Sequence, residues 1–297
     1  MAKQENNPKL ILSTPVRVAL LLCITFVCFF LMSLLSGVTT HWGESITTPK
    51  IRILTIVQDV LVFIIPALAT AMMVTRIPAS LLCINKNTNI STVLLAVLTM
   101  IASIPAMNMI ITWNAGIHLP ESMENIEIWL RASENSASQS ISLILGKDSI
   151  GDLIMSIMIV GVAAGFSEEL YFRGALQRLL STGGISRHGA IWIAAIIFSL
   201  FHFQFFGFIP RMLLGAFFGY LLVWTGCIWL PITAHILNNT IYIVNNWISM
   251  RQGLSEVSPG NEMPDSPQSV LLIAISIALT VVGLYLTRKS TRKSAAI

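Results

Sequence analysis

The chain has 297 residues, of which 55% are hydrophobic and only 11% are charged, and its mean hydropathy is +0.77. Because a soluble domain usually has about 25% charged residues, this composition excludes an ordinary soluble protein and indicates a polytopic membrane protein. The net charge at pH 7 is only +4, so we expect membrane lipid as a partner and no nucleic acid.

Eight apolar segments are long enough, or nearly long enough, to cross the roughly 30 Å hydrocarbon core of a bilayer. We therefore predict an all-α fold, a polytopic membrane bundle of about eight transmembrane helices. The sixth segment is the least certain of these because it is short for a full crossing. The segments are residues 16–37, 53–74, 92–113, 150 to the Glu168-Glu169 pair, 190–208, 212–225, 228–248 and 270–286.

The chain divides into three parts: N-terminal spans with one extramembrane loop (1–149), a membrane core with the polar motifs (150–250), and an outer loop, last span and basic tail (251–297). An even number of spans puts both termini on one side, and basic residues gather near both ends, which favours the cytoplasm. We expect an integral protein of the cell (inner) membrane with cytoplasmic N- and C-termini.

The extramembrane loop of the first part covers residues 117–147. Ile126, Trp129 and Leu130 have helical spacing, so we predict a short helix lying on the membrane here. Residues 133–142 are polar and are expected to form a loop. We expect the first three spans to carry no chemistry.

The fourth apolar segment ends in the sequence Ser-Glu-Glu-Leu-Tyr-Phe-Arg-Gly, residues 167–174. Ionisable side chains within a membrane segment are costly and indicate a functional site by default, although the acids could simply mark the water boundary. On a helix, Glu169 and Arg173 are four residues apart and can form an ion pair. Glu168 then lies on another face, as a free carboxylate suited to general base catalysis.

Two later spans contain further polar pairs at a spacing of four residues, Phe198 with His202 and His235 with Asn239. A polar residue in an apolar helix more often only joins two helices by a hydrogen bond. Three such sites in long spans, at similar expected depth, favour a shared cavity with Glu168 instead.

A carboxylate, two imidazoles and a carboxamide suit the hydrolysis of an amide. Glu168 could take a proton from water that His202 orients, and His235 and Asn239 could stabilise the oxyanion. We favour this chemistry without any cofactor. The alternative is a zinc ion bound by Glu168, His202 and His235, and a second alternative is a non-catalytic membrane scaffold, immunity protein or transporter.

The ordered motifs Glu-Glu-x-x-x-Arg, Phe-x-x-x-His and His-x-x-x-Asn, each in its own membrane segment, resemble the CAAX-processing and bacteriocin-processing (CPBP, or Abi) family of intramembrane endopeptidases. The Ras-converting CAAX proteases are its eukaryotic relatives. The resemblance covers about residues 151–246. It implies a glutamate-dependent CAAX-type peptidase acting on a membrane-associated protein or peptide, prenylated or bacteriocin-like, although members are often labelled metalloproteases.

The resemblance also implies a role for each motif residue. Glu168 and His202 would activate water, and His235 and Asn239 would form the oxyanion site. The supporting residues would be Glu169, Arg173 and Phe198.

Arg211 follows Pro210 at the start of the sixth segment. We expect it at a membrane edge, with a contact to a substrate carboxylate as the alternative. Gly215, Ala216 and Gly219 in the sixth segment form a face of small residues, which indicates close helix packing.

Overall fold

The computed structural model describes residues 10–39, 46–253 and 266–294, and within them it contains helices and turns without any strand. This confirms the predicted all-α membrane bundle. The long helices are α1 (Thr14–Thr39), α5 (Ile90–Ala115), α6 (Glu124–Leu145), α10 (Arg187–Leu200), α11 (Phe208–Thr225), α12 (Trp229–Arg251) and α13 (Pro267–Ser294).

Two further spans are composite. The second consists of α2 (Thr48–Gln58), the π-helix η1 (Asp59–Ile64) and α3 (Ile65–Val74). The fourth consists of α7 (Ile150–Ser156), the π-helix η3 (Ile157–Ala163), α8 (Ala164–Glu169), the π-helix η4 (Leu170–Gln177) and α9 (Arg178–Ser181). Short helices α4 (Pro78–Leu81), η2 (Glu121–Met123) and η5 (Phe205–Gly207) lie in connections.

Six helical segments are long and apolar enough to cross a membrane: Thr14–Val38, Thr48–Val74, Ile90–Ala115, Ile150–Ser181, Phe205–Thr225 and Pro267–Thr291. With α10 and α12 they correspond to the eight predicted segments. The short element is α10, with 14 residues, rather than the sixth segment. The chain turns at Phe203, which has a left-handed backbone (φ 52°), and Pro210 then fits the first turn of α11 because no backbone donor is needed there.

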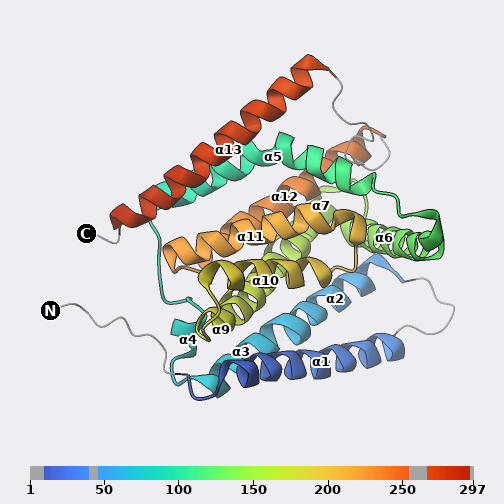
Figure 1. Cartoon of the computed structure of the whole chain (residues 1–297). Helices are drawn as coiled ribbons and strands as arrows, with labels where there is room; N and C mark the ends of the chain where they lie inside the picture. The colour runs from blue at the N-terminus through green and yellow to red at the C-terminus, as the bar shows by residue number, and fades with distance from the viewer. Residues whose placement is uncertain (1–9, 40–45, 254–265, 295–297) are drawn as a thin grey trace.

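The bundle has three layers (Figure 1). Helices α5 and α13 lie along each other on one side, and α1 lies with α2 and α3 on the other. The fourth span, α10, α11 and α12 lie between these layers. The start of α1 and the end of α13 lie at the same end of the bundle, in agreement with an even number of crossings.

Helix α6 corrects one prediction about the extramembrane segment. Residues 133–142 are helical and not a loop. The hydroxyls of Ser136, Ser140 and Ser142 donate to the backbone carbonyls four residues earlier, at 2.9–3.0 Å. These serines therefore satisfy their polar groups within the helix.

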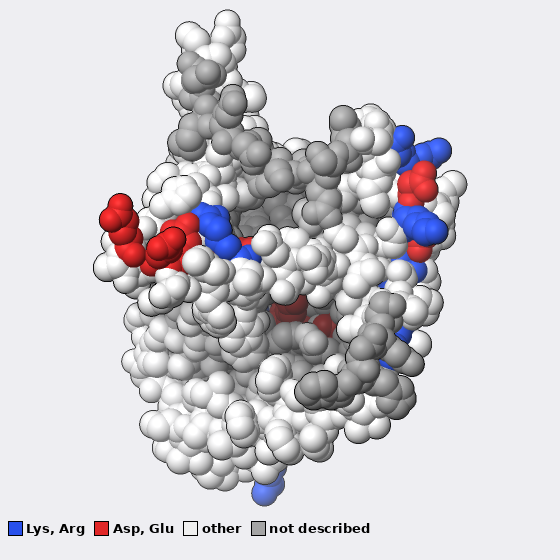
Figure 2. Space-filling view, turned by 90° about the vertical axis from the view of Figure 1, so that its right-hand side faces the viewer, with Lys and Arg blue, Asp and Glu red and all other residues white. Residues whose placement is uncertain are grey.

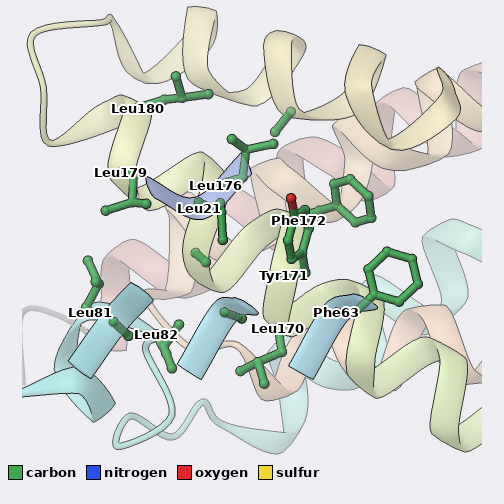
Figure 3. Packing of buried hydrophobic residues seen from close by; sticks show 14 of the residues in the cluster. Leu21, Phe63, Leu81, Leu82, Leu170, Tyr171, Phe172, Leu176, Leu179 and Leu180 are labelled. Atoms are coloured by element: carbon green, nitrogen blue, oxygen red, sulfur yellow. The ribbon is translucent and has the colours of Figure 1, made fainter. Parts of the chain in front are cut away.

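The centre of the main hydrophobic core is η4, in which all eight residues are buried. Leu170, Tyr171, Phe172 and Leu176 contact apolar side chains of α1, η1, α3 and α4, as Figure 3 shows from close by. Phe63 of η1 meets Tyr171 edge to face at 5.7 Å. The packing of the core thus holds the segment that carries the Glu-Glu-x-x-x-Arg motif.

Helix α11 contacts η4 through two glycines. Arg173 Nη2 donates to the Gly215 carbonyl at 2.9 Å, and Gln177 Nε2 donates to the Gly219 carbonyl at 3.1 Å. A Cβ atom at Gly219 would lie 2.7 Å from Gln177 Oε1. The small residues therefore bring the α11 backbone within reach of polar groups in the core.

Candidate active site

The segment that contains Glu168 changes its helical winding twice. The π-helix η3 ends at Ala163 and η4 begins at Leu170, so the two glutamates lie on a short α-helical piece between them. Such wide turns are rare and are frequent at functional sites. The sequence periodicity did not predict them.

Glu169 is fully buried and has two partners. Its Oε1 accepts hydrogen bonds from Arg173 Nη1 at 2.6 Å and from His235 Nδ1 at 2.9 Å. The Arg173 guanidinium also lies 4.5 Å from the centre of the Phe198 ring. The predicted ion pair between Glu169 and Arg173 is therefore present, and it also orients His235.

Glu168 has a different environment. Its Oε2 lies 3.8 Å from His235 Nε2, beyond hydrogen-bond distance, and this buried oxygen has no hydrogen-bond partner among the described residues. The side chain keeps 14% of its surface exposed, whereas Glu169 keeps none. The two adjacent carboxylates thus differ as their helical spacing predicts: one is paired and the other is free.

His202 lies in the turn after α10 and not within a helix, although its spacing to Phe198 is kept. Its Nδ1 is 2.9 Å from the Phe198 carbonyl oxygen. Because a carbonyl only accepts, this nitrogen carries the hydrogen, and Nε2 of the neutral ring is left as an acceptor. The Phe198 ring meets His202 at 5.0 Å and His235 at 5.9 Å, edge to face in both cases. Phe198 therefore separates and orients the two imidazoles.

Asn239 lies one turn beyond His235 on α12. Its Nδ2 donates to the Val160 carbonyl of η3 at 2.9 Å, and its Oδ1 accepts from Asn238 at 3.3 Å. In an α-helix, the backbone N–H of Ala164 would donate to the Val160 carbonyl. Here it donates to the carbonyls of Ile159 and Gly161 instead. The π-helix thus leaves the Val160 carbonyl to Asn239, and the structure joins this amide to η3 rather than to Glu168.

The proposed zinc ligands are Glu168, His202 and His235. Within the described part of the chain, no three His, Cys, Asp or Glu side chains are arranged so that they could hold one metal ion. His235 has one ring nitrogen on Glu169, and its other ring nitrogen is open. Because the described residues contain no three-ligand cluster, we derive no step through a metal.

Asp59 is a residue that the sequence analysis missed. It begins the π-helix η1 in the second span, is only 4% exposed, and lies near the side chain of Ser167. It interacts electrostatically with Glu168, the next residue after Ser167. A lone carboxylate in an apolar span is itself an indication of function, so the sequence did contain the signal.

Arg211 also belongs to this region. Its Nη2 donates to Gln204 Oε1 at 2.7 Å, and it interacts electrostatically with both Glu168 and His202. Gln204 in turn donates to Glu134 Oε2 of α6 at 3.2 Å. Helix α6 therefore contacts the segment that follows His202 from outside.

An apolar cavity of about 590 Å³ is lined by Phe201 and Phe203, the chain neighbours of His202, but by none of the four proposed catalytic side chains. Phe26 and Phe29 of α1, Gln58 of α2, Trp129 of α6 and Phe203 are among the residues that line it. Figure 2 shows acidic atoms deep in a hollow, on a face where other charged side chains lie near the edges.

Comparisons with known proteins agree with the motifs. Residues 150–241 match the family described as type II CAAX prenyl endopeptidase Rce1-like, which confirms the predicted resemblance. The chain is also similar to the uncharacterized protein YpbD of Bacillus subtilis (strain 168), with 29% identity over 103 residues. The aligned part is 33% of this chain and 48% of that relative. No solved structure matches the chain significantly. The apolar helices and the membrane-protease family indicate an integral membrane protein.

Proposed function

We propose, from the Rce1-like match of residues 150–241, that this chain is an intramembrane endopeptidase that uses a glutamate-activated water. One observation carries the proposal: Oε2 of Glu168 has no hydrogen-bond partner among the described residues, whereas the adjacent Glu169, although its own Oε2 is also unpartnered, is neutralised by Arg173 through Oε1. A partly buried carboxylate without a hydrogen bond, 3.8 Å from the His235 ring, suits general base catalysis.

In the proposed reaction, Glu168 removes a proton from water, and His202 Nε2 accepts a hydrogen bond from the O–H group that remains. The hydroxide forms a bond to the scissile carbonyl carbon, and negative charge moves to the carbonyl oxygen. When the C–N bond breaks, Glu168 returns the proton to the leaving amine. The products are a carboxylic acid, which then loses its proton to solvent, and an amine, and the enzyme is unchanged.

His235 and Asn239 are the proposed donors to the oxyanion. Asn239 has one N–H outside its bond to Val160. His235 donates through Nδ1 to Glu169, so its Nε2 donates only when the ring is doubly protonated. Glu169, Arg173 and Phe198 position these groups.

The proposed substrate is a membrane-associated protein or peptide. The apolar cavity is lined mainly by apolar side chains of α1, η1, α6 and the segment from Ser199 to Phe208, which includes both chain neighbours of His202. Such a groove suits an apolar chain that enters from the bilayer. A prenylated CAAX-type protein and a bacteriocin-like peptide are the two candidates. We place the enzyme in the cell membrane with both termini in the cytoplasm.

The test uses the full-length protein in liposomes with prenylated and unprenylated membrane peptides, and new termini are identified by mass spectrometry. We expect Glu168→Gln to lower cleavage by about 1,000-fold, within the range for a positioned general base, with an unchanged melting temperature. Glu121→Gln, an exposed acid before α6, is the matched control and should cleave normally. Normal cleavage by a folded Glu168→Gln variant would refute the mechanism.

The two alternatives predict other outcomes. A zinc peptidase would lose activity after removal of metal with a chelator and regain it with zinc, whereas the glutamate mechanism predicts full activity after chelation. A scaffold, immunity protein or transporter would cleave none of the peptides, and Glu168→Gln would then alter only folding or transport.

A further inference from the structure

We infer that Arg211 is a catalytic residue, which donates a hydrogen bond from Nη1 to the oxyanion that forms on the scissile carbonyl. The inference rests on the proposed peptidase function and adds a charged donor to it. It uses an arginine outside the three motifs.

The register of α11 against η4 places Arg211 at the level of the glutamates. Gln177 contacts the Gly219 carbonyl, and Arg173, one turn earlier, contacts the Gly215 carbonyl. Both contacts advance by four residues in the same direction along the two helices. Continuing this register by one more turn brings Arg211 to the level of residue 169. Arg211 is close enough to Glu168 for the two to interact electrostatically.

The packing of α11 against α10 indicates the same level for Arg211. A Cβ atom at Gly215 would lie 3.1 Å from Phe198 Cδ1, so Phe198 packs against this glycine. His202 follows Phe198 by four residues, and Arg211 precedes Gly215 by four. Helices α10 and α11 are joined by a tight turn and run in opposite directions. Four residues forward from Phe198 and four residues back from Gly215 therefore reach the same level of the bundle, which places His202 and Arg211 at that level. Arg211 has a stronger electrostatic interaction with His202 than His235 or Arg173 has.

The guanidinium of Arg211 is held in position, yet part of it is unused. Nη2 donates to Gln204, which is itself bonded to Glu134. A Cβ atom at Gly207 would lie 2.9 Å from Nη2, so the backbone passes close over the group. Nη1 is buried and has no hydrogen-bond partner within the described residues. A buried donor without a partner is costly, and a substrate oxygen would satisfy it.

The other two donors are largely occupied. Asn239 has one N–H on Val160, and His235 has its Nδ1 hydrogen on Glu169. Neither carries a permanent positive charge, whereas arginine is always protonated. The charge that develops in the transition state would therefore be best stabilised by Arg211.

The contacts favour an oxyanion over a substrate carboxylate. A carboxylate is usually gripped by two parallel N–H groups of the guanidinium. Here one terminal nitrogen is committed to Gln204, and one is free. One free nitrogen suits one oxygen atom. An oxyanion contact acts on kcat, whereas a carboxylate contact acts on KM.

The experiment compares Arg211→Met and Arg211→Lys with the wild-type chain in liposomes. The substrate is a synthetic peptide across the identified cleavage site, made with a free C-terminal acid and with a C-terminal amide. A phosphinate peptide, anionic and tetrahedral at the scissile position, is the inhibitor. We expect Arg211→Met to lower kcat about 100-fold, as loss of one oxyanion donor does, with little change in KM. Its affinity for the phosphinate should fall by a similar factor.

Two other variants keep the result interpretable. Arg178→Met removes a half-buried arginine that bonds the Leu81 carbonyl on the far side of η4, and should keep its kcat. Gln204→Leu keeps the arginine but removes the hydrogen bond that holds its guanidinium in position. We expect it to lower kcat about 10-fold, which is part of the effect of losing the donor entirely. It serves as the test if Arg211→Met does not fold.

Full kcat in folded Arg211→Met, or in Gln204→Leu if the former is unfolded, would overturn the inference. A rise of KM limited to the free-acid peptide would also overturn it, since that outcome indicates carboxylate binding. Either result leaves the peptidase function standing if the wild type cleaves and Glu168→Gln does not. Cleavage that survives Glu168→Gln would instead refute the proposed mechanism itself.

Discussion

The chain contains the same cluster of side chains twice, once in the membrane core and once outside it. In the core, Glu169 bonds Arg173 four residues later and His235 Nδ1. In the outer segment, Glu127 bonds Arg131 four residues later, at 2.9 Å, and His118 Nδ1, at 3.0 Å. The contacts are nearly identical, but Arg173 and Glu169 are fully buried while His118 is 78% exposed.

Burial therefore decides what each cluster can do. Solvent reaches the outer cluster through His118 and through Arg131, which is 38% exposed, so its ion pair is screened and is expected to contribute little. In the core, each of the three groups depends on the others, because an unpaired charge there has no solvent to stabilise it. Only the inner cluster can fix the direction of His235, the proposed oxyanion donor. The outer cluster ties the start of α6 to the Leu119 backbone.

The largest expected effect is the loss of the inner pair. Glu169→Gln leaves the Arg173 charge buried without a counterion, and we expect it to lower the free energy of unfolding by about 3–5 kcal/mol. Denaturation in detergent measures this. The double variant Glu169→Gln/Arg173→Met should recover part of the loss, since no charge remains. An unchanged free energy of unfolding in the single variant would show that burial does not distinguish the two clusters.

A smaller effect should follow from moving the inner arginine without removing it. In Gly215→Ala the new methyl group would meet Arg173 Nη2 at 2.9 Å and Phe198 Cδ1 at 3.1 Å. We expect a loss of about 1–3 kcal/mol in the free energy of unfolding, as overpacking usually causes. Gly37→Ala in α1 is the control, because no atom lies within 4 Å of its new Cβ. Equal stability of the two variants would contradict close packing at Gly215.

The smallest effect concerns the outer cluster and pH. The Leu119 backbone N–H, then Arg131 and His118, hold the pKa of Glu127 below its ordinary value. A lowered pKa stabilises the folded segment above the unfolded pKa, and this contribution is lost as pH falls through the folded pKa. Hydrogen exchange of the Leu119 amide, corrected for its intrinsic pH dependence, should therefore lose protection in acid. Glu127→Gln should remove that pH dependence and leave the melting temperature unchanged.

The spacing of residues along the chain was sufficient to predict part of the candidate active site. The step of four residues from Glu169 to Arg173 predicted the ion pair, and adjacency alone predicted that Glu168 would face elsewhere. Both features are present. The apolar runs predicted the membrane bundle, because length and hydropathy are sufficient to recognise a span.

The remaining contacts depended on partners distant in sequence. Asp59 is 109 residues before Glu168 by their numbers, and no pattern in the second span pointed to Ser167. The turn at Phe203 ended α10 early and moved His202 out of the helix. Asn239 bonded to Val160 because a π-helix, which has no sequence signature, exposed that carbonyl.

The sequence by itself determined that this is a helical membrane protein with a free and a paired glutamate on adjacent positions, since both follow from helical period and hydropathy. The tertiary structure alone decided which groups surround the free glutamate. Two glycines let α11 approach η4, and this approach sets the level of Arg211. Contacts between helices depend on packing at particular residues, and a single sequence does not specify them in advance.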